Sequence, residues 1–168
     1  MATIKFEDSL ENGAHLTLQI LIGYWQGTCK TWFEPDVLVD EAKIQATVTS
    51  LLGKRFISID YNSTLEEKPF EGKMIVGFDL PYSRFIISWM DSFHMGSQIM
   101  MAEGEATQTG FSVLGAYGSP EYESVWGWRT ELKIINNDEF VLTAYNITPE
   151  GEEAKATEAH YKRVEANV

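Results

Sequence analysis

The fold is decided by the stretch HLTLQILIGYWQGTCKTWF at residues 15–33, because its hydrophobic period changes at a single glycine. Before Gly23 the leucines and isoleucines recur at helical spacing. After Gly23, apolar and polar residues alternate, which is the period of a strand. The pattern therefore predicts a short helix over 12–22, capped by Asn12 and ended by Gly23, with a strand directly after it.

The alternating pattern continues to the end of the chain in short runs rich in Val, Ile, Thr and aromatic residues. Turn residues separate the runs, and no helical stretch long enough for a parallel crossover follows Gly23. The predicted strands are 24–33, 42–52, 55–62, 70–78, 84–91, 98–106, 110–117, 124–135, 139–147 and 154–164. Closing such strands into an antiparallel up-and-down barrel removes the exposed sheet edges. We therefore predict an all-β protein with one domain, 1–168, in which the barrel occupies 23–164.

The same alternation predicts which side chains point into the barrel. On the first strand Trp25, Cys29 and Phe33 are expected inside. The strand 84–91 is ambiguous, because either of two faces fits the interior: Phe85, Ile87, Trp89 and Asp91, or Ile86, Ser88 and Met90. Barrels of this size are either filled by side chains or hold one small ligand, and the sequence leaves both states open.

Composition narrows the classes of function. The chain has 25 acidic and 13 basic residues, a net charge of −12, which argues against nucleic-acid and anionic membrane partners. Cys29 is the only cysteine, so no internal disulfide forms and a reducing compartment is expected. The apolar run 14–22 is too short to span a bilayer and lacks the basic lead of a signal peptide. These features predict a soluble cytoplasmic protein.

A series of motifs runs along most of the chain in a characteristic order. They are His15 with Gly23-Tyr24-Trp25-Gln26-Gly27, Gly53-Lys54-Arg55-Phe56, Pro69-Phe70-Glu71-Gly72 with Gly77-Phe78-Asp79, Trp89-Met90-Asp91-Ser92, and Arg129-Thr130-Glu131-Leu132-Lys133. Together they resemble the domain-of-unknown-function family 1579. The resemblance implies a calycin-like barrel, similar to lipocalins and fatty-acid-binding proteins, with a short helix at its mouth and no established activity. The hairpin around Gly115 to Tyr122 departs from the family pattern.

Two pairs of residues are candidates for specific roles. Trp25 on the first strand is expected to stack beneath the guanidinium of Arg163 from the last strand and close the barrel. Asp91 and Arg129 define a site if both face inward. They then either form an ion pair with each other, or Arg129 binds the carboxylate of a ligand. In the alternative, Arg129 belongs to an outward charged stripe and Asp91 caps a turn.

The histidines His15, His94 and His160 lack the clustered spacing of a metal site, and no metal is predicted. His15 lies on the helix, where it either contacts a ligand or hydrogen-bonds to a rim loop. No cofactor is assigned. The alternative is a haem group whose iron is bound by His94 or His160. No nucleophile has a neighbouring base, so no catalytic residue is assigned. The candidate ligand-binding residues are His15, Trp89, Asp91, His94, Arg129 and Tyr145.

Two functions are consistent with these patterns. The first is a binding module that holds a small apolar or amphipathic ligand among the inward-facing aromatic residues. The second is a solid barrel that acts as an interaction or oligomerisation module, for example a homodimer, through exposed aromatic residues such as Tyr24 and Trp32. An enzyme is the less favoured class, because no constellation of residues supports one.

Overall fold

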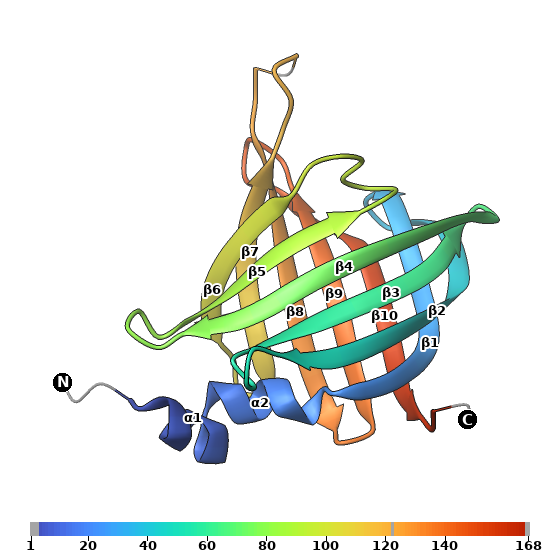
Figure 1. Cartoon of the computed structure of the whole chain (residues 1–168). Coiled ribbons are helices and arrows are strands. Elements are labelled where there is room, and N and C mark those ends of the chain that lie inside the picture. The colour runs from blue at the N-terminus through green and yellow to red at the C-terminus, as the bar shows by residue number, and fades with distance from the viewer. Residues whose placement is uncertain (1–3, 122, 167–168) are drawn as a thin grey trace.

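The structure, a computed structural model, describes residues 4–121 and 123–166, which form two short helices and a closed barrel (Figure 1). The helices are α1 (Phe6–Asn12) and α2 (Ala14–Ile20). The strands are β1 (Gly23–Glu34), β2 (Val37–Leu51), β3 (Phe56–Leu65), β4 (Lys68–Asp79), β5 (Arg84–Asp91), β6 (Met100–Ala106), β7 (Gly110–Tyr117), β8 (Trp126–Asn136), β9 (Glu139–Ile147) and β10 (Glu153–Val164). All pairings in the described chain are antiparallel, so the predicted all-β, up-and-down barrel is confirmed.

The N-terminal region differs from the prediction of one helix capped by Asn12. Asn12 is the last residue of α1, and α2 begins after Gly13, whose extended backbone (φ −126°, ψ −156°) interrupts the helix. A Cβ at this glycine would lie 2.9 Å from the Cα of Ser9, so the two helices approach closely here. The sequence pattern missed α1, although Glu7 and Asp8 stand in its first turn, where acidic residues are favourable.

The helices lie at the end of the barrel that we call the base, and the hairpins 35–36, 66–67 and 92–99 surround the opposite end, the mouth (Figure 1). The resemblance implied a helix at the mouth, but both helices are at the base. Residues 118–121 and 123–125 of the connection between β7 and β8 project beyond the mouth. Tyr122, in the hairpin that departs from the family pattern, lies outside the described residues.

The base is closed by contacts between the first and last strands. The guanidinium of Arg163 lies over the Trp25 ring, 4.2 Å from its centroid. The same guanidinium donates hydrogen bonds to the backbone carbonyls of Ile20, Ile22 and Asn137, at 2.6–3.0 Å. The Trp25 indole donates to the Leu21 carbonyl at 2.8 Å. These bonds satisfy carbonyl groups at the end of α2 that have no partner within the helix.

The interior near the base is filled by side chains. Phe85 of β5 stacks on Phe111 with 4.7 Å between ring centroids, and Phe140 stacks on Tyr161 at the same distance. The first of the two alternatives for β5 is correct, because Phe85, Ile87, Trp89 and Asp91 are the buried residues of this strand. The period-two pattern fits both faces, since Ile86 and Met90 on the outer face of β5 are also apolar.

Phe33 does not face inward as predicted. The register of β1 against β2 shifts twice, between Thr31 and Trp32 and between Trp32 and Glu34, which breaks the alternation of inner and outer faces. Phe33 is therefore 56% exposed at the mouth, where it stacks on Phe93 of the β5–β6 connection.

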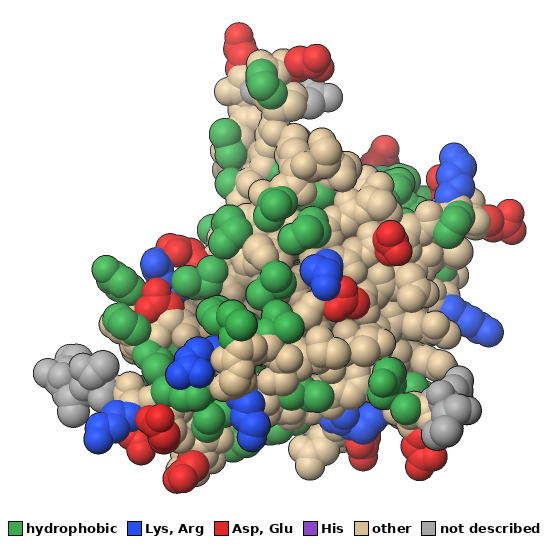
Figure 2. All heavy atoms as spheres, viewed as in Figure 1, with side chains coloured by type: hydrophobic (Ala, Val, Ile, Leu, Met, Phe, Trp, Pro, Cys, Tyr) green, Lys and Arg blue, Asp and Glu red, His purple; other side chains and the backbone are tan. Residues whose placement is uncertain are grey.

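The outer wall also carries apolar side chains. Figure 2 shows them gathered on the face where β4, β5 and β6 lie. A shallow groove on this wall is lined mainly by Phe56, Ile75, Phe78, Ile86 and Met101.

Within the part of the chain that the structure describes, neither helix is long and apolar enough to cross a bilayer.

Candidate functional site

A cavity of about 60 Å³ lies inside the barrel on the side of the mouth. Aromatic side chains form much of its wall, and smaller residues such as Ala144 and Ala159 complete it. The aromatic side chains come from five strands and the β5–β6 connection: Tyr61, Phe70, Trp89, His94, Trp128 and Tyr161. The packing that fills the base therefore leaves this cavity in the other half of the barrel.

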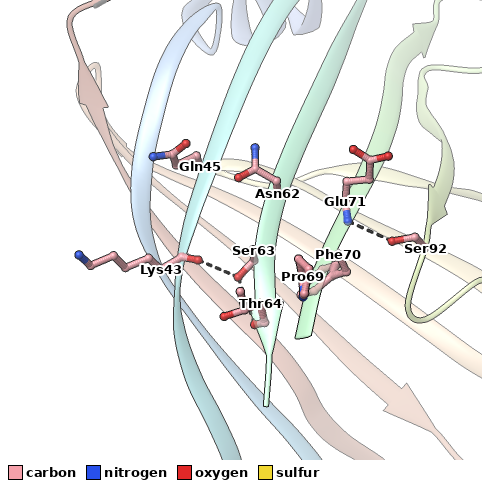
Figure 3. Close-up of a pocket in the computed structure, with 9 residues that line it drawn as sticks. All are labelled: Lys43, Gln45, Asn62, Ser63, Thr64, Pro69, Phe70, Glu71 and Ser92. Atoms are coloured by element: carbon pink, nitrogen blue, oxygen red, sulfur yellow. Dashed lines mark hydrogen bonds between the residues drawn. The ribbon is translucent and has the colours of Figure 1, made fainter. Parts of the chain in front are cut away.

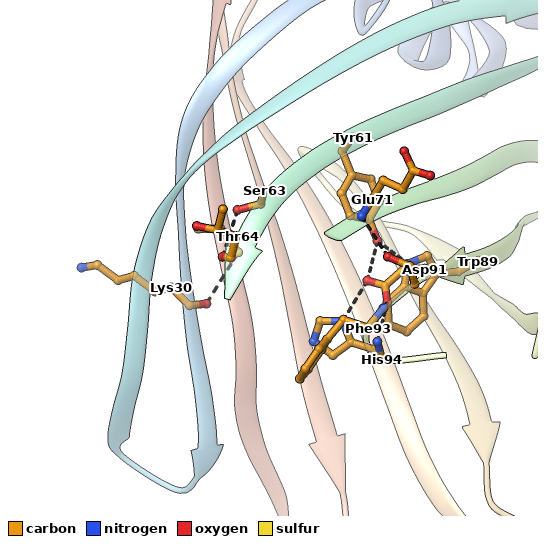
Figure 4. A network of polar contacts seen from close by, with 11 residues as sticks. Lys30, Tyr61, Ser63, Thr64, Glu71, Trp89, Asp91, Phe93 and His94 are labelled. Carbon is orange, nitrogen blue, oxygen red and sulfur yellow. Dashed lines mark hydrogen bonds and ion pairs between the residues drawn. The ribbon is translucent and has the colours of Figure 1, made fainter. Parts of the chain in front are cut away.

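Asp91, at the end of β5, is the centre of a polar network in this cavity (Figure 4). Its Oδ1 accepts hydrogen bonds from the backbone N–H groups of Phe93, at 2.9 Å, and of His94. Its Oδ2 accepts from the Tyr61 hydroxyl at 3.0 Å and contacts Nδ1 of the His94 ring at 2.8 Å. The Trp89 indole donates to the same tyrosine oxygen at 2.7 Å. Asp91 thus fixes both the turn that follows β5 and the His94 ring.

Tyr61 reaches this network because residue 72 is a glycine. In the ladder, Tyr61 of β3 pairs with Gly72 of β4, which pairs in turn with Asp91 of β5. A Cβ on Gly72 would lie 2.2 Å from Cζ of the tyrosine ring. The ring therefore crosses β4 through space that any other residue would occupy, and its hydroxyl meets the carboxylate two strands away.

The ionisation of the network follows from these contacts. Burial raises the pKa of Asp91, but the hydrogen bonds and charge of His94 and the bond from Tyr61 outweigh burial and leave this pKa below its usual value. Burial and the charge of Asp91 raise the pKa of Tyr61 well above its usual value. At neutral pH the site therefore holds a carboxylate and a neutral phenol.

The His94 ring is enclosed by aromatic residues. Its centroid lies 4.8 Å from Phe93, 5.6 Å from Trp89, and 6.0 Å from both Phe70 and Trp128. The two tryptophan rings are stacked on each other at 5.3 Å. Phe93, 46% exposed, extends this aromatic wall from the cavity to the mouth. The entrance is thus apolar, and the polar network lies behind it.

The structure brings Trp89, Asp91 and His94 together but places Arg129 and Tyr145 on the outer wall. Arg129 binds the carboxylate of Glu153 at 2.6 and 2.9 Å and lies over the Tyr145 ring, 4.0 Å from its centroid. The ion pair between Asp91 and Arg129 is therefore absent. Arg129 alternates with inward-facing neighbours on β8, so the interpretation as an outward charged stripe is the correct one.

The other candidate histidines also lie away from the cavity. His15 is buried at the base, where its Nδ1 is 2.8 Å from Oγ of Ser9 and its ring packs edge-on against Phe6. His160 is exposed on the outer wall beside Glu158. In the described residues, no group of three or more His, Cys, Asp or Glu is placed to hold a metal ion.

The cavity does not fit the haem that was the alternative cofactor. A cavity of roughly 150 Å³ accommodates a single benzene molecule. A porphyrin contains four pyrrole rings, so the space of about 60 Å³ beside His94 is far too small for it. Cys29 also lines this cavity, and burial raises the pKa of its thiol to about 11, which leaves it protonated at neutral pH.

An open pocket on the outer wall is a weaker candidate (Figure 3). It lies where the β2–β3 ladder ends, beyond the pair Gln45 and Asn62. There the hydroxyl of Ser63 donates to the Lys43 carbonyl at 2.8 Å in place of a ladder bond. The charged side chains of this pocket, such as that of Glu71, are exposed to water. Such groups contribute little binding energy, so the interior cavity is the better site.

Tyr61, Phe93 and Gly72 belong to the candidate site but were not among the residues predicted from the sequence. Tyr61 lies on the same face of β3 as the inward residues Ile57 and Ile59, so the alternation of this strand is a signal that could have placed it inside. Its contact with Asp91 depends on the alignment of three strands, which no local pattern specifies.

Comparison with known proteins identifies the family and supports the fold. Residues 11–163 match the model of a family described as "Protein of unknown function (DUF1579)", and the chain belongs to this family. A search of curated proteins gives no match. Among solved structures, Rv2717c from M. tuberculosis is similar with a TM-score of 0.64 at 13% identity, covering 90% of this chain and 97% of that one. The S-type phycobiliprotein lyase CPES from Guillardia theta is similar with a TM-score of 0.59 at 10% identity, covering 98% and 100%.

Proposed function

We propose that this member of the DUF1579 family binds a small apolar or amphipathic molecule inside its barrel, in the cavity beside Asp91 and His94. The observation that carries the proposal is the combination of an aromatic cavity with a buried polar network. Ligand sites in proteins are typically apolar, with a few well-placed polar groups that fix the orientation of the ligand.

The size of the cavity limits what it encloses. A volume of about 60 Å³ holds a group of a few heavy atoms and is smaller than the roughly 150 Å³ that takes up benzene. A longer ligand therefore places one end in the cavity and the rest along the exposed rings of Phe33 and Phe93 at the mouth. An amphipathic molecule with a compact head and a linear tail fits this shape.

Filling the cavity is the direct test of this proposal. Ala144 is buried and lines the cavity, so Ala144→Leu places three further carbon atoms in the space. Linear alkanols from butanol to octanol serve as neutral amphipathic probes, with binding measured by titration calorimetry. We expect the wild-type protein to bind longer alkanols more tightly, since each buried CH₂ contributes about 0.8 kcal/mol. Ala144→Leu should weaken this binding by about tenfold or more.

The matched control is Ala116→Leu, which adds the same atoms at an exposed position of β7. This variant should bind the alkanols like the wild type. If the wild type binds none of them, or if Ala144→Leu binds them unchanged, the cavity is not a ligand site.

A further inference from the structure

We propose that the cavity selects ligands whose head group donates a hydrogen bond, amines above all, and rejects carboxylates, with Nε2 of His94 as the accepting atom. This inference rests on the proposed function and names the chemical class of its ligand. It separates this barrel from one that holds a carboxylate through an interior arginine, because Arg129 is on the outer wall.

The first step of the argument is that Asp91 has no free acceptor site. A carboxylate offers about four lone-pair positions. Here they receive the backbone N–H groups of Phe93 and His94, the Tyr61 hydroxyl and the His94 ring. A ligand therefore meets the negative charge of Asp91 through the groups that surround it and not through a direct bond.

The second step concerns the tautomer of His94. The carboxylate of Asp91 only accepts hydrogen bonds, so the 2.8 Å contact with Nδ1 requires the proton to be on Nδ1. In the neutral ring Nε2 then carries a lone pair. Among the described residues, this nitrogen has no hydrogen-bond partner. The His94 side chain is 18% exposed and lines the cavity, so a ligand can reach it.

The third step is the charge of the wall. Of the described residues that line the cavity, Asp91 is the only acidic one, and none is a lysine or arginine. Phenylalanine, tyrosine and tryptophan side chains also line the wall, and aromatic faces attract cations. A ligand carboxylate would enter a site with a fixed negative charge and no lysine or arginine to pair with it, which is strongly unfavourable. An ammonium or amine head meets an acceptor, a negative charge and aromatic rings together.

A series of probes with one tail and three heads tests the inference: hexylamine, 1-hexanol and hexanoate. Affinities are measured by titration calorimetry at neutral pH. We expect the wild-type protein to bind hexylamine most tightly and hexanoate most weakly, with about tenfold or more between these two. Equal affinity for hexanoate and hexylamine would overturn the inference while the proposed function stands. If none of the three binds, the proposed function itself fails.

Asp91→Asn changes the tautomer while conserving the shape of the side chain. The Asn oxygen can still accept from the N–H groups of Phe93 and His94, and its amide then donates to Nδ1. The proton of the His94 ring is thereby moved to Nε2, which becomes a donor. We expect this variant to lose the preference for hexylamine and to bind hexanoate more tightly than the wild type does. An unchanged preference would contradict the assigned role of Asp91.

Two further variants keep the test decisive. Asp36→Asn removes one negative charge from an exposed position in the β1–β2 hairpin, and its preference should match that of the wild type. His94→Phe retains a ring of similar shape without an acceptor, so it should bind 1-hexanol but lose the preference for hexylamine.

Nitrogen-15 NMR of the imidazole gives an independent readout, because it distinguishes a protonated from an unprotonated Nε2 in the wild type and in Asp91→Asn.

Discussion

At the scale of single residues, Gly72 controls whether the network at Asp91 exists. The Tyr61 ring occupies the space where a Cβ of residue 72 would lie, 2.2 Å from Cζ. The backbone of Tyr61 is fixed by its pairing with β4, so its ring cannot move away without losing the hydrogen bonds to Asp91 and Trp89. The glycine is thus required for the close approach and not for an unusual backbone angle.

We predict that Gly72→Ala destabilises the protein by about 1–3 kcal/mol, the usual cost of overpacking. Urea unfolding measures this loss, and the indole N–H resonance of Trp89 should shift as its bond to Tyr61 breaks. Gly118→Ala is the control, since its Cβ would be 3.6 Å from its nearest neighbour, an ordinary contact. In a Tyr61→Leu background, Gly72→Ala should lower the free energy of unfolding much less. Additive effects of the two substitutions would disprove the steric explanation.

Asp91 gives the protein a specific dependence on pH. Its pKa is lower in the folded protein than its ordinary value, so the carboxylate stabilises the fold above that ordinary value, about 3.9. This contribution is lost as pH falls through the lower pKa of the folded state. Asp60, Glu153 and Glu158 also have lowered pKa values, so the wild-type curve alone does not isolate Asp91.

The comparison with Asp91→Asn isolates the residue. At pH 7 we expect the variant to be less stable by about 1.5–3 kcal/mol, the range for a hydrogen bond to a charged group. The difference in unfolding free energy, measured with urea between pH 7 and pH 3, should narrow as the pH falls below about 4. A difference that stays constant over this range would show that the charge of Asp91 does not stabilise the fold.

The residues of the site could be predicted only in part. The motif Trp89-Met90-Asp91-Ser92 and the nearby His94 indicated the right segment, because they are close in sequence. Arg129 and Tyr145 were wrong as interior candidates, since the alternation of β8 and β9 turns them outward. The contact of Tyr61 with Asp91 could not be predicted, because it depends on strand register across β3, β4 and β5.

At the scale of elements, alternation located the strands well, and the limits of β5, β7 and β9 agree with the prediction at both ends. The errors occur where alternation stops being informative. At the end of β1, two register shifts turn Phe33 to the rim, and such bulges leave no mark in the hydrophobic pattern. At the N-terminus, Gly13 was included in one helix, although its backbone separates α1 from α2.

The joint between α2, β1 and β10 depends on Arg163. We predict that Arg163→Met destabilises the protein by about 2–3 kcal/mol, because it removes the hydrogen bonds to the carbonyls of Ile20, Ile22 and Asn137. Thermal and urea unfolding measure the loss.

Arg129→Met is the matched control. Arg129 also lies over an aromatic ring, but it pairs with exposed glutamates on the outer wall, and such pairs contribute about 1 kcal/mol or less. If the two variants lose equal stability, the bonds from Arg163 to the backbone are not what secures the base.

At the scale of the whole molecule, the two states that the sequence left open both occur, in different halves of the barrel. Stacked aromatic rings fill the base, while a small cavity remains towards the mouth. The sequence could not predict this division, because a cavity of a few tens of Å³ depends on how all the interior side chains pack together. Composition sets the total volume of these side chains but not where a space is left.

The order of the strands also has a consequence for the kinetics of folding. In the described chain, every strand pairing except β1 with β10 joins neighbours in sequence, so most of the sheet forms through local hairpins. The pairing of Tyr24 with Val164 instead requires nearly the whole chain to be arranged first, and such non-local contacts form slowly. The bonds of Arg163 at this seam therefore belong to the last stage of folding. They act mainly by slowing the opening of the finished barrel, and contribute little to the speed at which it assembles.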